Sequence, residues 1–255
     1  MDPHPQLLES LRRAKHVVVL TGAGVSAESG LATFRDKQSG LWEKFDALEL
    51  ATPAAFAKDP PLVWGWYEWR RAAVLRAQPN GAHKAIADMA NAVPRLTLVT
   101  QNVDDLHERA GSPSVLHLHG QLAHPYCEHC RRGYEFRSAE MSNLPQEGYR
   151  MEPPRCESCG GRVRPGVVWF GEPLPAAEWH AALGAAEAAD VFFCVGTSST
   201  VQPAASLTDI AIEAGALTVQ INPNATEVDA KVAFAYRAPA GEMLPQIVRR
   251  AWSKG

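Results

Sequence analysis

The chain has 255 residues, of which 46% are hydrophobic and 21% charged, and its formal net charge at pH 7 is −3. This composition is typical of a globular protein with one large core and room for a small additional module. The small negative charge gives no general attraction to nucleic acid or to a membrane surface. The longest apolar runs, such as 191–195, are far shorter than the roughly 20 residues of a membrane-spanning helix. The N-terminus has no basic segment followed by an apolar one, so we expect no signal peptide and a cytoplasmic protein.

Short runs of apolar, mostly β-branched residues predict buried strands at 17–20, 96–100, 115–118, 191–195 and 217–221. Helices are predicted at 5–14, 82–92, 105–110, 176–188, 203–214 and 241–252. A further helix is predicted to start at Asp59, a capping residue, and to include residues 64–71. Residues 31–42 are expected to form a long loop. Strands that alternate with helices indicate an α/β fold with a parallel, doubly wound sheet.

A glycine-rich turn follows the first predicted strand and spans residues 22–30. The spacing Gly22-x-Gly24-x-x-Ala27 fits the pattern of dinucleotide-binding turns, in which backbone N–H groups approach a phosphate. The ribose is normally held by an acidic residue that ends a second strand about 20 residues later, but residues 31–47 contain no run that predicts a strand. The turn alone therefore leaves two interpretations open, a nucleotide site and an ordinary glycine turn, and any ribose must be held by other residues.

Polar or glycine-rich clusters follow each of the other predicted strands as well. They are 101–104, His119-Gly120, 196–199 and 222–224. Because the carboxyl ends of parallel strands share one edge of a sheet, we expect these clusters to converge on one ligand-binding crevice. His119 is the residue best suited to move a proton near neutral pH. Any one cluster by itself is equally well explained as a turn, or as a hydrogen-bonded histidine.

Four of the five cysteines form two close pairs, Cys127-x-x-Cys130 and Cys156-x-x-Cys159, with 25 residues between the pairs. Each pair directs two thiolates at one ion, and four thiolates form a closed tetrahedral zinc site with no open position for a substrate. We therefore predict a small inserted zinc-binding module in which the metal is structural. The alternatives are an iron–sulfur cluster, a redox dithiol pair and unpaired thiols. Cys194 lies alone in a predicted strand and is expected to be a core residue.

The motifs GAGVSAESG, TFR, TQNVD, HLHG, the two CxxC pairs, VVWFGE, VGTSS and INPN occur in this order. Together they resemble the sirtuins, which are NAD-dependent protein lysine deacylases, over residues 15–245. The resemblance implies a large Rossmann-like NAD-binding domain, formed by 1–120 and 167–255, and a small zinc-binding module at 121–166. Part of the 31–80 region is expected to pack with that module, and NAD and an acylated lysine enter the cleft between the two units.

The resemblance also assigns roles to individual residues. The residues implied for NAD binding are Gly22, Ala23, Gly24, Ala27, Glu28, Phe34, Arg35, Gln101, Asn102, Asp104, Gly196, Thr197, Ser198, Asn222 and Ala240. His119 is the implied general base, with Asn102 and Asp104 as further catalytic residues, and Asn222 would hold the ribose on the adenine side. Val168, Gly171 and Glu172 resemble the strand that pairs with the substrate backbone. The implied products are free lysine, nicotinamide and O-acyl-ADP-ribose.

Tyr67 and Arg70 are three residues apart on a predicted helix and so share one face. A guanidinium beside a phenol is a good receptor for a carboxylate. This pair, together with Ala27 and Thr33, resembles the sirtuin subclass that removes succinyl and malonyl groups, so we expect acidic acyl groups to be preferred and acetyl-lysine to react more slowly. The alternative is an Arg70 that is solvated or paired with Glu68 or Asp59.

Two positions depart from the family pattern, since Gly166 stands where relatives usually have histidine and Gln202 where many have tyrosine. The expected partners are acylated lysines of proteins, without nucleic acid or membrane, and the expected state is a monomer. Two other functions remain open at this point. The chain could bind NAD or ADP-ribose as a sensor without turnover, or it could consume NAD as an ADP-ribosyltransferase or hydrolase.

Overall fold

The computed structural model describes residues 2–32, 46–137, 145 and 148–252. The predicted loop at 31–42 and the residues Thr33, Phe34 and Arg35 therefore fall largely or wholly outside the described residues. None of the helices in the described ranges is long and apolar enough to cross a membrane.

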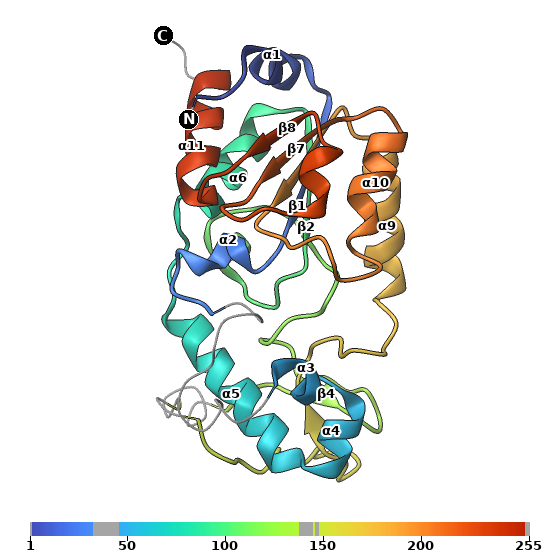
Figure 1. The fold of residues 1–255 in the computed structure, drawn as a ribbon. Coiled ribbons are helices and arrows are strands. Elements are labelled where there is room, and N and C mark those ends of the chain that lie inside the picture. Colours follow the sequence, from blue (N-terminus) through green and yellow to red (C-terminus); the bar gives the residue numbers. More distant parts are fainter. Residues whose placement is uncertain (1, 33–45, 138–144, 146–147, 253–255) are drawn as a thin grey trace.

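One parallel sheet of six strands forms the centre of the larger part of the molecule (Figure 1). Its strands are β1 (His16–Thr21), β2 (Arg95–Thr100), β3 (Val115–His117), β6 (Val191–Val195), β7 (Leu217–Ile221) and β8 (Phe234–Tyr236). The spatial order is β3-β2-β1-β6-β7-β8, and all neighbouring pairs are parallel. With the two inserted strands left out, this is the strand order of a dinucleotide-binding Rossmann sheet. The predicted α/β class and doubly wound sheet are confirmed.

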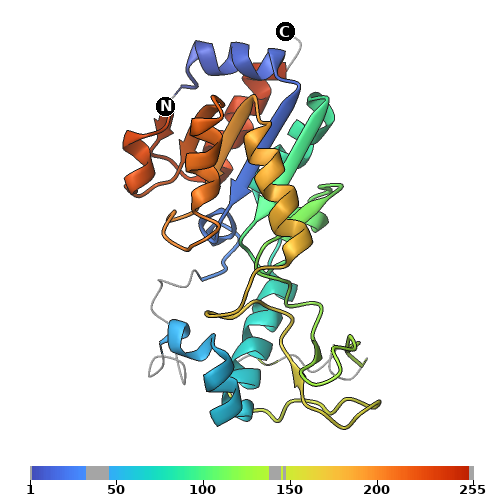
Figure 2. The same ribbon diagram turned by 90° about the vertical axis from the view of Figure 1, so that its right-hand side faces the viewer.

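Helices cover both faces of this sheet, as the two views in Figures 1 and 2 show. On one face lie α1 (Pro5–Arg13), α6 (Gly81–Ala92) and α11 (Ala240–Trp252), and on the other lie α9 (Ala176–Glu187) and α10 (Ser206–Glu213). Side chains alternate along β1, so that Val17 and Val19 join the first core and Val18 and Leu20 the second. Both faces are covered, which is why this strand is apolar throughout.

A second, smaller group of elements lies beyond the carboxyl edge of the sheet (Figure 1). It consists of α3 (Ala47–Leu50), α4 (Pro53–Lys58), α5 (Pro60–Arg76), β4 (Tyr126–Cys127) and β5 (Val163–Arg164). Phe56 and Trp66 from the helices share one apolar core with Leu122, Val163 and Val167 from the cysteine segment. The helices before β2 and the inserted segment are thus held together by burial of large apolar side chains.

Three short elements complete the described structure, namely α2 (Gly24–Ala27), α7 (Leu106–Arg109) and the 3₁₀ helix η2 (Glu227–Ala230). The predicted start of α5 is confirmed, because Asp59 accepts a hydrogen bond from the Leu62 N–H (3.2 Å) and prolines occupy its first turn. The sequence analysis did not predict α2, α3, α4 or β8.

Candidate active site

The strand order reverses between β1 and β6, and the glycine-rich turn lies at the carboxyl end of β1. The N–H groups of Gly22 and Gly24 donate to the carbonyl oxygens of Val195 (3.0 Å) and Gly196 (2.8 Å). A Cβ atom at Gly24 would lie 2.7 Å from the Gly196 oxygen, and one at Gly196 would lie 2.4 Å from the Val25 nitrogen. The backbones of the two turns touch, so glycine is the only residue that fits. The N–H groups of Gly22 and Gly24, which the motif was expected to offer to a phosphate, bind β6 in this structure.

Other residues implied for NAD binding gather at the same edge. The Gln101 side chain donates to Thr197 Oγ1 (3.0 Å), and the Asn222 Nδ2 group donates to the Thr197 carbonyl (2.8 Å). Residues that follow β2, β6 and β7 therefore meet at Thr197. Ser198 lies beside it, and its hydroxyl bonds only Thr200 Oγ1 among the described residues (2.9 Å).

Glu28 and Ala240 lie together at one side of this edge. The Glu28 carboxylate accepts a hydrogen bond from the Gly241 N–H (2.8 Å), in the first turn of α11. Ala240 begins that helix and is buried, and Ala27, at the end of α2, is exposed. Glu28 therefore links the glycine-rich turn to α11.

Asn102 and Asp104 are buried and joined through Ser26. The Asn102 Nδ2 group donates to Ser26 Oγ (3.1 Å), and Ser26 Oγ donates to Asp104 Oδ2 (3.0 Å). Burial raises the pKa of Asp104, although hydrogen bonds from Leu106 and Ser26 oppose this. The Asn102 amide nitrogen is held by the protein, so its Oδ1 atom is left as the group that can accept a hydrogen bond.

His83 on α6 completes this cluster and was not anticipated from the sequence. Its Nε2 atom lies 3.4 Å from Ser26 Oγ, and its Nδ1 atom accepts from the Asn80 N–H (3.3 Å). Nδ1 therefore carries no proton, and Nε2 is the donor. Burial lowers the pKa of His83 to about 4, so the ring is neutral at physiological pH.

His119 is oriented by a main-chain carbonyl. Its Nδ1 atom lies 3.0 Å from the Gln101 oxygen, which can only accept, so Nδ1 carries the proton and Nε2 the lone pair. Burial lowers the pKa of His119, and the bond to Gln101 opposes this only partly. His119 is thus a neutral base with one nitrogen ready to accept a proton.

The chain directly after His119 passes close to the start of the predicted substrate-pairing segment. Gly120 has φ +74°, and a Cβ there would lie 2.2 Å from the Gly166 oxygen. The Val168 N–H donates to the His119 carbonyl (2.8 Å). The same contacts limit position 166, because a Cβ at Gly166 would lie 2.0 Å from the His124 oxygen. This chain path leaves no space for the histidine that relatives usually have there.

The residues 168–172 form a turn rather than a strand in this structure. Glu172 accepts two hydrogen bonds from the Arg164 guanidinium (2.6 and 2.8 Å) and a third from the Trp169 N–H (2.9 Å). Gly171 has φ +88°, which suits the turn. The carboxylate of Glu172 therefore shapes this turn from within the protein.

Tyr67 and Arg70 lie on α5, which faces the turn at 168–172. The buried Tyr67 hydroxyl accepts a hydrogen bond from Trp169 Nε1 (3.0 Å), and the Arg70 guanidinium lies over the Trp66 ring, 5.1 Å from its centroid. Burial lowers the pKa of Arg70, while the attraction of Tyr67 and Asp104 favours its charge. A cation in these surroundings is suited to bind an anion.

The two carboxylates considered as alternative partners of Arg70, Glu68 and Asp59, bind other arginines. Glu68 forms a buried ion pair with Arg71 (2.6 Å), and Asp59 binds Arg150 (2.6 Å). The alternative interpretation of Arg70 as the partner of Glu68 or Asp59 is therefore not supported.

The four paired cysteines form one cluster in which all sulfur atoms lie within 4.8 Å of one another. The Sγ atoms of Cys127 and Cys159 are 3.5 Å apart, and those of Cys130 and Cys156 are 3.7 Å apart. These distances are far longer than a disulfide bond. Tetrahedral zinc with Zn–S bonds of about 2.3 Å gives sulfur separations of about 3.8 Å. The cysteines therefore fit a closed, structural zinc site.

Comparison with known proteins places this arrangement in a family. The model of the Sir2 family matches residues 22–203. The chain belongs to the Sir2 family. An NAD-dependent protein deacylase of Methylococcus capsulatus is 53% identical over 98% of this chain and 97% of its own length. NAD-dependent protein deacylase 1 of Pseudomonas aeruginosa is 54% identical over 96% of this chain and 98% of its own length.

Solved structures of the Sir2 family show the same fold. A Sir2 homologue in complex with NAD has a TM-score of 0.88 and 44% identity, and the match covers 98% of this chain and 95% of the homologue's chain. A variant Sir2 homologue in complex with 2′-O-acetyl ADP-ribose has a TM-score of 0.89 and 45% identity, with coverage of 98% and 96%. A complex of Sir2 with a p53 peptide and NAD+ has a TM-score of 0.81 and 29% identity, with coverage of 96% and 95%.

Several polar residues of this Sir2-family site had no assigned role in the sequence analysis. They are Ser26, His83, Thr100, His107, Glu108 and His117. Most are buried beneath the carboxyl edge of the sheet, where they bind one another or the turn at 101–104. The motifs contain Ser26 and His117, but their positions in the sequence do not show which groups they bind.

Proposed function

We propose that this protein is an NAD-dependent protein lysine deacylase. The observation that carries the proposal is His119, a neutral base with a fixed proton on Nδ1. It lies at the carboxyl edge of the sheet beside the Asn102–Ser26–Asp104 cluster, whose Ser26 belongs to the turn where the strand order reverses. Full-length relatives that are 53% and 54% identical carry the name of this activity. Ligands bind at such reversal points in open α/β sheets.

In the proposed reaction NAD is a co-substrate that is consumed. It occupies the edge formed by the turns at 22–28 and 196–198, with its nicotinamide toward Asn102 and Asp104. The acyl oxygen of the substrate lysine displaces nicotinamide from the ribose. His119 then accepts a proton from a ribose hydroxyl through Nε2, so that the ribose oxygen attacks the acyl carbon. One water molecule is consumed as the bond between the acyl carbon and the lysine nitrogen breaks, and the products are free lysine, nicotinamide and O-acyl-ADP-ribose.

The substrate side of the proposed site is formed by the smaller group of elements. The extended backbone around an acylated lysine pairs with the segment that contains Val168 and Gly171, while Glu172 holds that segment through Arg164. Main-chain pairing of this kind reads little sequence, so many proteins are expected to serve as substrates. Structural zinc, bound by the four cysteines, maintains the fold of this part.

Acidic acyl groups are the proposed preference. A succinyl or malonyl chain ends in a carboxylate, which can bind both the Arg70 guanidinium and the Tyr67 hydroxyl. Tyr67 is held in place by Trp169, so its hydroxyl is oriented before the substrate arrives. Such a charge-assisted contact is worth about 1.5–3 kcal/mol, which is a selectivity of roughly 10- to 100-fold. Acetyl-lysine lacks the carboxylate and is expected to react more slowly.

The test measures NAD-dependent release of nicotinamide from matched peptides that carry acetyl-lysine or succinyl-lysine. Replacing the general base, in His119→Ala, is expected to lower turnover of both peptides by about 100-fold or more. Arg70→Met is expected to lower kcat/KM for the succinyl peptide by roughly 10- to 100-fold and to spare the acetyl peptide. Arg76→Met is the matched control, because Arg76 is an exposed arginine at the end of the same helix.

Each outcome separates one part of the proposal. If the acetyl peptide is turned over faster than the succinyl peptide, the proposed acyl preference is contradicted, but the deacylase activity is still supported. Nicotinamide release that does not depend on an acylated peptide would contradict the deacylase itself and favour an NAD hydrolase.

A further inference from the structure

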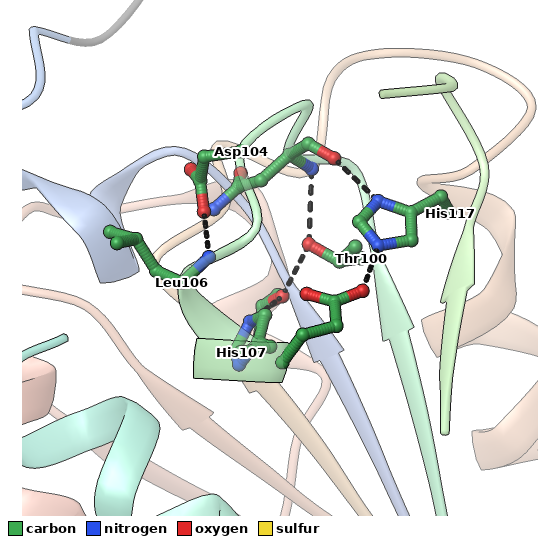
Figure 3. A network of polar contacts seen from close by, with 8 residues as sticks. Thr100, Asp104, Leu106, His107 and His117 are labelled. Atoms are coloured by element: carbon green, nitrogen blue, oxygen red, sulfur yellow. Dashed lines mark hydrogen bonds and ion pairs between the residues drawn. The ribbon is translucent and has the colours of Figure 1, made fainter. Parts of the chain in front are cut away.

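Two histidines at the end of β3 hold two consecutive carbonyl groups of the turn at 101–104. His119 Nδ1 lies 3.0 Å from the Gln101 oxygen, and His117 Nδ1 lies 3.2 Å from the Asn102 oxygen. Figure 3 shows His117, Thr100 and His107 in one chain of polar contacts beneath the turn that carries Asp104. His119 has a role in the proposed reaction, whereas His117 has none.

The partners of His117 hold its ring at both nitrogens. Nδ1 lies 3.2 Å from the Asn102 carbonyl oxygen, and Nε2 lies 2.6 Å from Glu108 Oε1 on α7. Burial alone would raise the pKa of Glu108, but the hydrogen bonds and charges around it together outweigh burial and lower the pKa, so this carboxylate is ionised at neutral pH. His117 therefore connects the turn at 101–104 to a carboxylate on α7.

The hydrogen bond between His117 and the turn is buried. His117 is only 5% exposed, so its contact with the Asn102 carbonyl is shielded from water. Glu108 is more accessible, since 38% of its side chain is exposed. The other titratable groups near the two residues are Asp104, His107 and His124.

The Asn102 peptide is held from both sides. Its carbonyl accepts from His117, and its N–H donates to Thr100 Oγ1 (3.0 Å). The direction of the Asn102 side chain follows from this backbone, and so does the position of the Gln101 carbonyl that orients His119. Loss of the hydrogen bond from His117 would leave both the Asn102 side chain and the Gln101 carbonyl less firmly positioned.

We propose that His117, hydrogen-bonded to Glu108, is a positioning residue that fixes the turn at 101–104 and through it both Asn102 and His119. This proposal rests on the proposed deacylase function. His117 touches no reacting atom, so its effect falls on kcat. The KM for the acyl peptide is determined by residues on α5 and at 168–172 and is expected to change little.

His16 provides a matched control at the opposite end of the sheet. It is also 5% exposed, and its Nδ1 atom also lies 3.2 Å from a main-chain carbonyl, that of Ala188. His16 begins β1 and is remote from the carboxyl edge. Truncation of either histidine removes a buried ring and one main-chain contact, but only His117 contacts the catalytic turn.

The experiment measures kcat and KM for the acyl peptide in His117→Ala, His117→Asn and His16→Ala. We expect kcat to fall about 10- to 100-fold in His117→Ala, as for a displaced catalytic group. It should stay near the original value in His16→Ala. In His117→Asn an amide N–H replaces Nδ1 and should restore most of kcat. A kcat in His117→Ala that matches the His16→Ala value would overturn the proposal.

A second measurement needs no turnover and so separates this proposal from the proposed function. Nitrogen-15 NMR of the histidine side chains is expected to show a proton on His117 Nδ1 that is held in a hydrogen bond to the Asn102 carbonyl. A His117 Nδ1 atom without that hydrogen bond would contradict the positioning role. If the NMR result is as expected but the original chain releases no nicotinamide, the deacylase assignment fails and the structural part of the inference stands.

Discussion

Two buried histidines beneath the site, His83 and His107, are kept neutral by their surroundings. Burial lowers the pKa of His107 to about 3, with electrostatic repulsion from neighbouring histidines as a smaller cause, and burial lowers the pKa of His83 to about 4. His107 Nε2 lies 3.0 Å from Thr21 Oγ1, and that hydroxyl donates to Thr100 Oγ1 (2.8 Å). Nε2 of His107 is therefore the donor, and the ring supports the threonine that holds Asn102.

These two histidines predict a loss of stability in acid. In the unfolded chain they bind protons below about pH 6.5, whereas in the folded chain they stay neutral down to about pH 4. The unfolded state then binds more protons, so the free energy of unfolding falls as the pH falls from about 6.5 to 4. The slope is up to about 1.4 kcal/mol per pH unit for each histidine.

Thermal unfolding as a function of pH measures this slope. His107→Gln keeps an amide donor toward Thr21 and cannot titrate, so it is expected to reduce the slope by the share of one histidine. His180→Gln, at an exposed position on α9, should leave the slope unchanged. Identical slopes in the original chain and in His107→Gln would show that His107 is charged in the folded protein.

The residues that sequence reasoning could and could not identify differ in a physical way. Glycines in turns, paired cysteines and His119 stand in patterns that backbone geometry or metal chemistry requires. His83 and His107 are isolated polar residues within helices, and nothing in their spacing separates a buried, hydrogen-bonded side chain from a solvated one. Their roles depend on partners that are distant in sequence, as for His107 and Thr21.

At the scale of elements, apolar runs predicted the strands that helices cover on both faces. The edge strand β8 escaped because its three residues, Phe234–Tyr236, are too few for an apolar run. The helices α2, α3 and α4 have four to six residues, which is too short for a helical repeat to show in the sequence. Helices of this length are stabilised by tertiary packing and caps, such as Thr52 at α4, rather than by propensity.

The contact between the two glycine turns gives a prediction at this scale. Gly196→Ala adds a Cβ at φ +59° and 2.4 Å from the Val25 nitrogen, so the turns must separate. We expect a lower melting temperature and weaker binding of ADP-ribose by calorimetry. Gly184→Ala is the control of opposite sign, because Gly184 lies in α9 with open space around its Cβ and should gain about 0.5–1 kcal/mol of stability. Unchanged ADP-ribose binding in Gly196→Ala would contradict the role of this contact.

At the scale of the whole molecule, the proposed site lies where two separately built cores meet. The sheet and its helices carry the residues proposed to bind NAD, whereas α3, α4, α5 and the cysteine segment share the other core. The sequence indicated the sheet and the metal cluster. The joining of α5 to the cysteine segment depends on an apolar core that includes Trp66 and Val163, and no local pattern encodes that core. The domain boundaries at residues 120 and 167 stay a prediction.

This division predicts that removal of zinc affects the two substrates unequally. Without metal, nothing holds the four sulfur atoms together, although they lie 3.5–3.7 Å apart in pairs, and β4 and β5 contain only two residues each. The core shared by Val163 and the α5 tryptophans then loosens, and with it the segment proposed to bind the acyl peptide. The sheet keeps its own cores.

After treatment with a strong chelator, deacylation is expected to be lost while calorimetry still detects ADP-ribose binding, and added zinc should restore turnover. Cys156→Ser should behave like the chelated protein, whereas Cys194→Ser, in the sheet, should keep its zinc. Loss of ADP-ribose binding together with deacylation would show that the two cores unfold as one unit.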